Sequence, residues 1–249
     1  TRRSSDLEAS ERFASIAGYT GCPGYIVHMT CEGALNAVRD NNRHNQKVFA
    51  ETCIQYLLLD ASLYEQNFDG AKWVMSPPLR EKKDQEALWA GINQGLVQVV
   101  ATDHCPFKWE QKLMGKDDFS KIPNGHPAIE HRVELLFSEG VRKGRITLNK
   151  FVEVLSTNPA KIFGMFPRKG CIAPGADADI VLFDPNQEHT ISVNTHHMNT
   201  DYSAYEGWKL TGKCKTVILR GNVVIDEGEC LAEKGYGKYI RRNKVSQLI

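Results

Sequence analysis

Apolar residues follow two alternating patterns over the first 170 positions. Helical spacing occurs at residues 7–17, 31–41 and 85–94. Short apolar runs typical of buried strands occur at residues 25–27, 47–53 and 97–102. Strands and helices therefore alternate, which predicts parallel strands connected by crossover helices.

The segments around these elements are less regular. Residues 56–79 are predicted to be irregular, and the polar stretch 108–126 is predicted to be a surface loop. Further helices are predicted at residues 129–138, at 148–156, and at 160–163 after the start signal Asn158-Pro159.

The pattern changes after Gly170. Four short strands with turn residues between them are predicted at residues 178–183, 190–193, 214–220 and 222–225. Gly221-Asn222 stands where a hairpin turn would fall. We therefore expect a βα region over residues 1–170 and a small all-β region with a tail over residues 171–249.

Two residues with metal-binding side chains follow predicted strands. His28 ends the first strand, and Asp103 follows the third. In parallel α/β folds, ligands and metals bind at the carboxyl ends of the strands. An imidazole nitrogen and a carboxylate oxygen both suit Zn²⁺, and an aspartate beside a metal can also accept a proton from water.

Position alone leaves other interpretations open. A single histidine after a strand is more often a hydrogen-bonded structural residue, and an aspartate there often caps a helix. His104 follows Asp103 directly and is expected to point elsewhere if the strand continues. The pair His196-His197 lies in the β-rich part, where a solvated or structural role is favoured.

Composition narrows the class of protein. The chain has 249 residues, a formal net charge of +1 and 24% charged residues, which gives no electrostatic argument for nucleic acid or an anionic membrane as partner. No apolar run approaches the length that crosses a bilayer. Seven scattered cysteines without a CxxC pair favour a reducing, cytoplasmic compartment.

Five separated blocks of sequence resemble one known family. They read YIVHMTC from residue 25, SPPLR from 76, VATDHCPF from 100, IPNGHPAIEHR from 122, and NPAKIFGMFPRKGCIAPG from 158, which continues as ADADIVLFDP. In this order and spacing they resemble the dihydropyrimidinases, D-hydantoinases and phenylhydantoinases of the amidohydrolase superfamily. The resemblance extends over essentially the whole chain.

This resemblance implies a fold and a site. The fold is a partial (β/α)₈ TIM-like barrel, strands six to eight, followed by part of a small β-sandwich. The site holds two divalent metal ions, usually Zn²⁺, with His28 as the ligand after strand six and Asp103 as ligand and proton carrier after strand eight. Main-chain groups at Ser76 and Asn124 would bind the cyclic imide or ureide substrate. Without the family, both would be interpreted as turn residues.

Other parts of the family's site are not in this sequence. The family's first metal motif is His-x-His, and no two histidines here are separated by one residue. The carboxylated lysine and a further histidine ligand would lie before Thr1. The chain is therefore interpreted as the carboxy-terminal half of an enzyme, or alternatively as a truncated product without catalysis. Three strands cannot close a barrel, and exposed sheet edges promote aggregation.

The expected activity is metal-dependent hydrolysis of a dihydropyrimidine or a 5-substituted hydantoin to an N-carbamoyl amino acid, in a protein that includes the missing half. An allantoinase-like cyclic amidohydrolase is the enzymatic alternative. A non-catalytic scaffold similar to the collapsin response mediator proteins is the other, although the presence of His28 and Asp103 argues against it. By analogy with the family, we expect a homotetramer.

Overall fold

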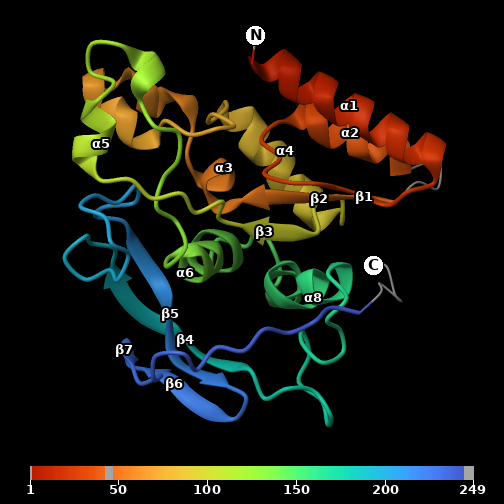
Figure 1. Cartoon of the computed structure of the whole chain (residues 1–249), viewed down its shortest axis with the longest axis vertical. Helices are drawn as coiled ribbons and strands as arrows, with labels where there is room; N and C mark the ends of the chain where they lie inside the picture. Colours follow the sequence, from red (N-terminus) through yellow and green to blue (C-terminus); the bar gives the residue numbers. More distant parts are fainter. Residues whose placement is uncertain (1, 43–46, 244–249) are drawn as a thin grey trace. The chain divides into compact units, whose positions relative to one another are not determined.

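A computed structural model describes residues 2–42 and 47–243 (Figure 1). Contacts between backbone positions divide the chain into two compact units. The first unit comprises residues 1–132 and 190–208, and the second comprises residues 133–189 and 209–249.

The first unit is built on a parallel sheet of three strands. Its strands are β1 (Gly24–Ile26), β2 (Val48–Cys53) and β3 (Val99–Ala101), in the order β1-β2-β3 (Figure 1). Both pairs are parallel, with Tyr25 opposite Phe49 and Thr52 opposite Val100. The predicted strands and their parallel direction are confirmed, and the carboxyl ends of all three strands face the same edge of the sheet.

Five α-helices accompany this sheet: α1 (Arg2–Thr20), α2 (Glu32–Asn42), α3 (Ile54–Leu58), α4 (Lys82–Asn93) and α5 (Trp109–Leu113). The three predicted helices are confirmed as α1, α2 and α4. Helix α2 buries one apolar face, which includes Leu35 and Val38, and it packs against α4. Gly91 permits this approach, because a Cβ atom there would lie 2.8 Å from the Leu35 side chain.

Two predictions of irregular chain were incomplete. The 56–79 region contains the end of α3 and two 3₁₀ helices, Ala61–Glu65 and Asn67–Trp73. The 108–126 region contains α5 and a 3₁₀ turn at Phe119–Lys121. Its description as a surface loop is wrong for Lys112, which has no solvent exposure.

The second unit begins with helices. Helix α6 (Arg132–Leu136) starts at the boundary and continues as a π turn over Phe137–Val141. Helix α7 (Leu148–Val152) is followed by another π turn and by α8 (Asn158–Ile162). These agree with the predicted helices, with Pro159 in the first turn of α8.

An antiparallel sheet completes this unit. Its strands are β4 (Ile180–Thr190), β5 (Lys209–Leu219), β6 (Asn222–Asp226) and β7 (Glu229–Cys230), in sequence order. The predicted hairpin is present between β5 and β6. Its turn lies one residue earlier than predicted, at Arg220 and Gly221, because Asn222 already begins β6 and pairs with Leu219. The φ values of the two turn residues are 50° and 82°, as a type I′ turn requires.

One predicted strand is wrong. Strand β4 extends to Thr190, and no strand covers residues 191–193. Ile191 exchanges backbone hydrogen bonds with Gly207 and Trp208, and the chain then turns, with the Thr195 N–H donating to the Ser192 carbonyl. The apolar run is therefore too short to continue as a strand.

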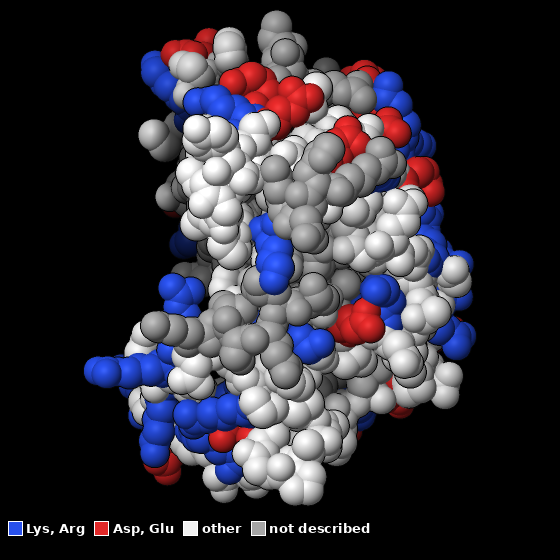
Figure 2. Space-filling model, turned by 90° about the vertical axis from the view of Figure 1, so that its right-hand side faces the viewer, with Lys and Arg blue, Asp and Glu red and all other residues white. Residues whose placement is uncertain are grey.

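The order of elements agrees with a βα part followed by an all-β part, since α8 is followed by β4 to β7. The boundary at residue 170 stays a prediction. On the face drawn in Figure 2, basic side chains (Lys or Arg) and acidic side chains (Asp or Glu) both occur, as expected for a net charge of +1. Within the described part of the chain, no helix combines the length and apolar character needed to span a membrane.

Candidate active site

His28 and Asp103 occupy equivalent places on the parallel sheet. His28 is the second residue after the end of β1, and Asp103 is the second residue after the end of β3. Both have a left-handed backbone, with φ values of 40° and 47°. This region is unfavourable for residues other than glycine, although aspartate tolerates it better than most. Both ligand candidates therefore stand on sharply turned backbone at the same edge of the sheet.

The segment that includes β2 and α3 fixes both turns. The Thr52 hydroxyl donates a 2.8 Å hydrogen bond to the carbonyl of Met29, the residue after His28. The Gln55 amide donates a 3.0 Å hydrogen bond to the carbonyl of Thr102, the residue before Asp103. Thr52 is 0% exposed and Gln55 is 1% exposed. These buried bonds hold the backbone beside each candidate ligand.

Cys53 lies at the carboxyl end of β2, between the two candidates. Burial, followed by the negative charges of Glu51 and Asp103, raises the pKa of the Cys53 thiol well above its ordinary value. The charge of Asp103 also contributes, after burial, to a raised pKa of the Tyr56 hydroxyl. Asp103 is thus electrostatically close to the end of β2, and Cys53 is an inert, protonated thiol.

The segments that carry Ser76 and Asn124 lie side by side. The Gly125 N–H donates a 3.0 Å hydrogen bond to the Val74 carbonyl. A Cβ atom at Gly125 would lie 2.5 Å from the Cys105 carbonyl oxygen, so this position requires glycine. Ser76 and Asn124 are both exposed. Two positions that are 48 residues apart in sequence are thereby brought onto adjoining segments of the first unit.

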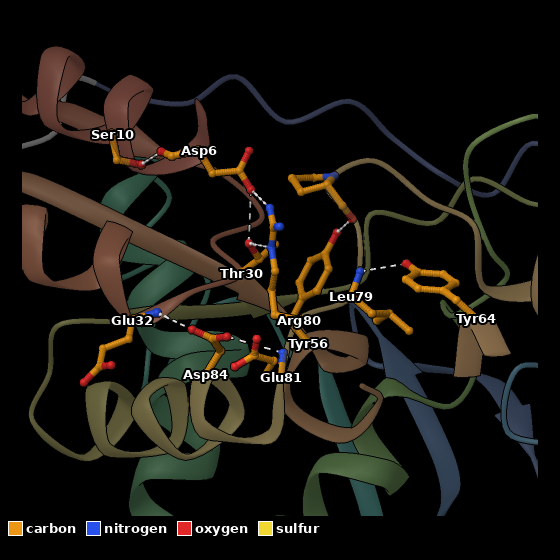
Figure 3. A network of polar contacts seen from close by, with 11 residues as sticks. Asp6, Ser10, Thr30, Glu32, Tyr56, Tyr64, Leu79, Arg80, Glu81 and Asp84 are labelled. Atoms are coloured by element: carbon orange, nitrogen blue, oxygen red, sulfur yellow. Dashed lines mark hydrogen bonds and ion pairs between the residues drawn. The ribbon is translucent and has the colours of Figure 1, made fainter. Parts of the chain in front are cut away.

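A polar network supports the segment that follows Ser76 (Figure 3). The Tyr56 hydroxyl donates to the Pro77 carbonyl at 2.8 Å, and the Leu79 N–H donates to the Tyr64 hydroxyl at 2.8 Å. Both tyrosines precede this segment in the chain, in α3 and in the first 3₁₀ helix. The network fixes the path of the chain from Pro77 to Leu79.

Arg80 connects this segment to the one that follows His28. Its Nε donates a 3.1 Å hydrogen bond to the Thr30 hydroxyl, and its guanidinium forms an ion pair with Asp6 of α1 (Figure 3). Asp84 of α4 accepts a 3.1 Å hydrogen bond from the Glu32 N–H at the start of α2. Arg80 therefore ties the segment after Ser76 to α1 and to the segment after His28, and Asp84 ties α4 to the start of α2.

The model of the amidohydrolase family matches residues 14–224. The D-hydantoinase of Geobacillus stearothermophilus is 48% identical over 244 residues, which are 97% of this chain and 52% of that protein. The chain belongs to the amidohydrolase family. Its resemblance to the dihydropyrimidinases and hydantoinases within that family is also confirmed.

Solved structures of amidohydrolases support the same assignment. The dihydropyrimidinase of Brevibacillus agri has a TM-score of 0.95 at 47% identity, covering 97% of this chain and 53% of that one. The L-hydantoinase of Arthrobacter aurescens has a TM-score of 0.87 at 29% identity, covering 95% and 52%. The chain thus spans about half the length of the relatives it matches.

The described residues include side chains that can bind a metal ion, but these side chains do not form a complete set of metal ligands. Among residues 2–42 and 47–243, no group of three or more His, Cys, Asp or Glu side chains could hold an ion. Catalytic zinc takes three protein ligands and keeps a position open for water. His28 and Asp103 are chemically suitable, so they would form part of such a set.

A cavity of about 260 Å³ lies beside His28. Residues of α1, β1 and Pro77 line it together with His28. Asp103 is not among the lining residues found in the described part of the chain. The structure therefore places the two candidates at one sheet edge, with His28 alone of the two lining this particular cavity.

Three other histidines, His104, His196 and His197, have structural contacts. His104 Nδ1 accepts from the N–H groups of Ala128 and Ile129 at 3.1 and 3.3 Å, which agrees with its expected orientation away from Asp103. His196 bonds to the Thr200 carbonyl, and His197 bonds to the Glu130 carboxylate at 2.8 Å. Burial lowers the pKa of His126 to about 3, so its ring is neutral.

Proposed function

We propose that the protein hydrolyses a cyclic amide, either a dihydropyrimidine or a 5-substituted hydantoin, to an N-carbamoyl amino acid. The observation that carries this proposal is the equivalent placement of His28 and Asp103, each two residues past a parallel strand and each on left-handed backbone. The printed names of the similar proteins, hydantoinase and dihydropyrimidinase, support the choice of substrate class.

The proposed fold is part of a (β/α)₈ barrel, in which β1, β2 and β3 are strands six, seven and eight. Parallel neighbours in sequential order, joined by helices on crossover connections, support this assignment. The strands and metal ligands that complete such a barrel would come from sequence outside these 249 residues, including the carboxylated lysine. The antiparallel sheet would be part of the small β-sandwich.

The proposed cofactor is a pair of divalent metal ions, Zn²⁺ being our choice. Because β2 lies between β1 and β3, the backbones of the outer strands are roughly 10 Å apart. Side chains can reach across this spacing, so His28 and Asp103 would hold such a pair together with further ligands from outside these residues, and the metals would activate a water for attack.

When bound, the metals would lower the pKa of a water and polarise the ring carbonyl, so that water attacks at neutral pH. The Asp103 carboxylate accepts the proton of the attacking water. It then returns this proton to the ring nitrogen as the carbon–nitrogen bond breaks. The former ring carbonyl becomes the carboxylate of the product. Asp103 thus serves as ligand and as proton carrier.

Ser76 and Asn124 would bind the substrate through their main-chain groups. Hydrogen bonds from backbone groups suit a planar imide or ureide, which presents alternating N–H donors and carbonyl acceptors. The contact between Gly125 and Val74 supports this role, because it keeps the two segments adjacent.

Replacing Asp103 tests the mechanism. In the full-length product of the gene that encodes this sequence, Asp103→Asn should lower kcat/KM for hydantoin opening by about 100-fold or more, since general acid–base groups contribute that much. Asparagine tolerates the left-handed backbone, so the fold should persist. Asp117→Asn, a change at an exposed aspartate, is the matched control. Retained activity in Asp103→Asn would refute the proton transfer.

Parallel assays separate the alternatives. Dihydrouracil, 5-substituted hydantoins and allantoin are offered to the purified protein, and the N-carbamoyl product is measured by chromatography. Hydrolysis of allantoin alone would identify an allantoinase. Absence of bound metal together with no ring opening would favour a scaffold similar to the collapsin response mediator proteins.

We also propose a cellular compartment, a partner and an oligomeric state for this activity. All seven cysteines are free thiols, which supports a reducing, cytoplasmic compartment. The partner is a small-molecule substrate, with neither nucleic acid nor membrane. A homotetramer remains our expectation by analogy with the family, and light scattering of the full-length protein measures it.

A further inference from the structure

Lys112 of α5 is a fully buried lysine outside the proposed chemistry. It is 0% exposed. Its Nζ donates hydrogen bonds to three backbone carbonyls: Val74 at 2.9 Å, Pro123 at 2.7 Å and Gly125 at 2.8 Å. Nζ also lies 5.4 Å from the centre of the Phe107 ring. One ammonium group therefore contacts three segments that are distant from each other in sequence.

The chemistry of these contacts matches an ammonium group. A protonated lysine has three N–H donors and no acceptor, and three carbonyl oxygens receive them here. Desolvation by burial lowers the pKa of Lys112 to about 8, so the side chain remains charged at pH 7. A neutral amine would have only two donors for the three carbonyls.

Each contact lies next to a residue of the proposed site. Val74 precedes Ser76 by two positions, and Pro123 and Gly125 flank Asn124. Phe107 belongs to the segment that follows Asp103. The bond from the Gly125 N–H to the Val74 carbonyl joins the first two segments directly, and Lys112 donates to that same carbonyl.

We propose that Lys112 is a positioning residue that sets the relative placement of the Ser76 and Asn124 segments, and thereby the affinity for the substrate ring. This inference rests on the proposed function, in which main-chain groups of both segments bind the substrate. Lys112 touches no reacting atom and acts through the backbone of these neighbours.

Burial alone would not need an ammonium group. Methionine has a side chain of similar length and would fill much of the same volume at low cost in packing. It has no donors, so each of the three carbonyls would lose the bond from Nζ, and the Val74 carbonyl would keep only the bond from the Gly125 N–H. Lys112→Met therefore removes the hydrogen bonds that connect the segments while it keeps most of the side-chain volume in the core. Lys116→Met, at an exposed lysine of the same region, is the matched control.

Hydrogen exchange tests the structural part without reference to activity. Comparing the full-length wild type with both variants by mass spectrometry, we expect faster exchange in Lys112→Met in peptides covering residues 74–80 and 122–128. Peptides of β2 should keep wild-type rates, and Lys116→Met should match wild type throughout. Unchanged exchange in both segments, or equally faster exchange in every peptide, would overturn the proposal.

Kinetics test the functional part. Lys112→Met should raise KM for a 5-substituted hydantoin by about tenfold while kcat changes by less than about threefold, because the loss is in substrate binding. A fall in kcat with unchanged KM would overturn the positioning role. If the wild type opens no cyclic amide, the proposed function fails. The exchange experiment still decides whether Lys112 ties the segments.

Discussion

At the residue scale, both candidate metal ligands stand in a costly backbone conformation. A left-handed residue that is not glycine costs roughly 1–2 kcal/mol, and such residues persist only where the surroundings fix them. At His28 and Asp103 the fixing bonds come from Thr52 and Gln55. A fold that needed only a turn at these positions would be more stable with glycine.

Strain at His28 predicts which of two variants at this position is the more stable. In metal-free protein, His28→Gly should be more stable than His28→Ala by about 1 kcal/mol, because glycine adopts φ 40° without a Cβ clash. Urea unfolding measures the difference. At Lys116, whose φ is not positive, Lys116→Gly should be less stable than Lys116→Ala, or equally stable. The same preference for glycine at both positions would contradict strain at His28.

Residues also differ in how far sequence reveals them. His28 and Asp103 were predicted as candidates because each follows an apolar run, which is a local signal. Lys112 was not predicted as a functional residue, because its partner Val74 is 38 residues away and a lysine in a polar stretch is normally exposed. Gln55 and Thr52 donate hydrogen bonds to main-chain carbonyls. Every residue has such a carbonyl, so the sequence does not show which one each side chain contacts. Such contacts become visible only once the chain is folded.

At the scale of elements, β2 is the strand that connects the two candidate ligands. It pairs with β1 on one side and β3 on the other, and its continuation into α3 carries Gln55. The pattern of apolar residues predicted all three strands, because each is a buried run. It did not predict α5, β7 or the end of β4, since these depend on contacts beyond their own residues.

The hydroxyl of Thr52 provides a test at this scale. In the full-length protein, Thr52→Val removes the 2.8 Å bond to the Met29 carbonyl but keeps the shape of the side chain. We expect a loss of about 1–3 kcal/mol in unfolding free energy, because a buried carbonyl loses its donor. Metal affinity should fall about tenfold as His28 loses its support. Competition with a chelator measures this affinity.

Thr52→Ser is the matched control, since it keeps the hydroxyl and loses only a methyl group. It should lose about 1 kcal/mol of stability through reduced burial and a small cavity, but keep metal affinity close to wild type. Equal affinities in the valine and serine variants would show that the hydroxyl does not position His28.

At the scale of the whole molecule, the parallel sheet has two outer strands. Among residues 2–42 and 47–243, β1 and β3 each pair with one strand only. Parallel sheets are normally covered on both faces, and in barrels every strand has two neighbours. Open strand edges present unpaired N–H and C=O groups to other chains. Within the described residues, β1 and β3 therefore each have one side without a strand partner.

We therefore predict that the 249-residue chain alone self-associates at micromolar concentration, whereas the full-length product of the gene forms one discrete species. Size-exclusion chromatography with light scattering measures both. Val27 follows β1 and is 47% exposed, so Val27→Lys should reduce association by placing a charge at that edge. Val152→Lys, at a valine that is 48% exposed on α7, should not. A monomeric 249-residue chain at every concentration, or equal effects of the two substitutions, would show that the edge beside β1 does not drive association.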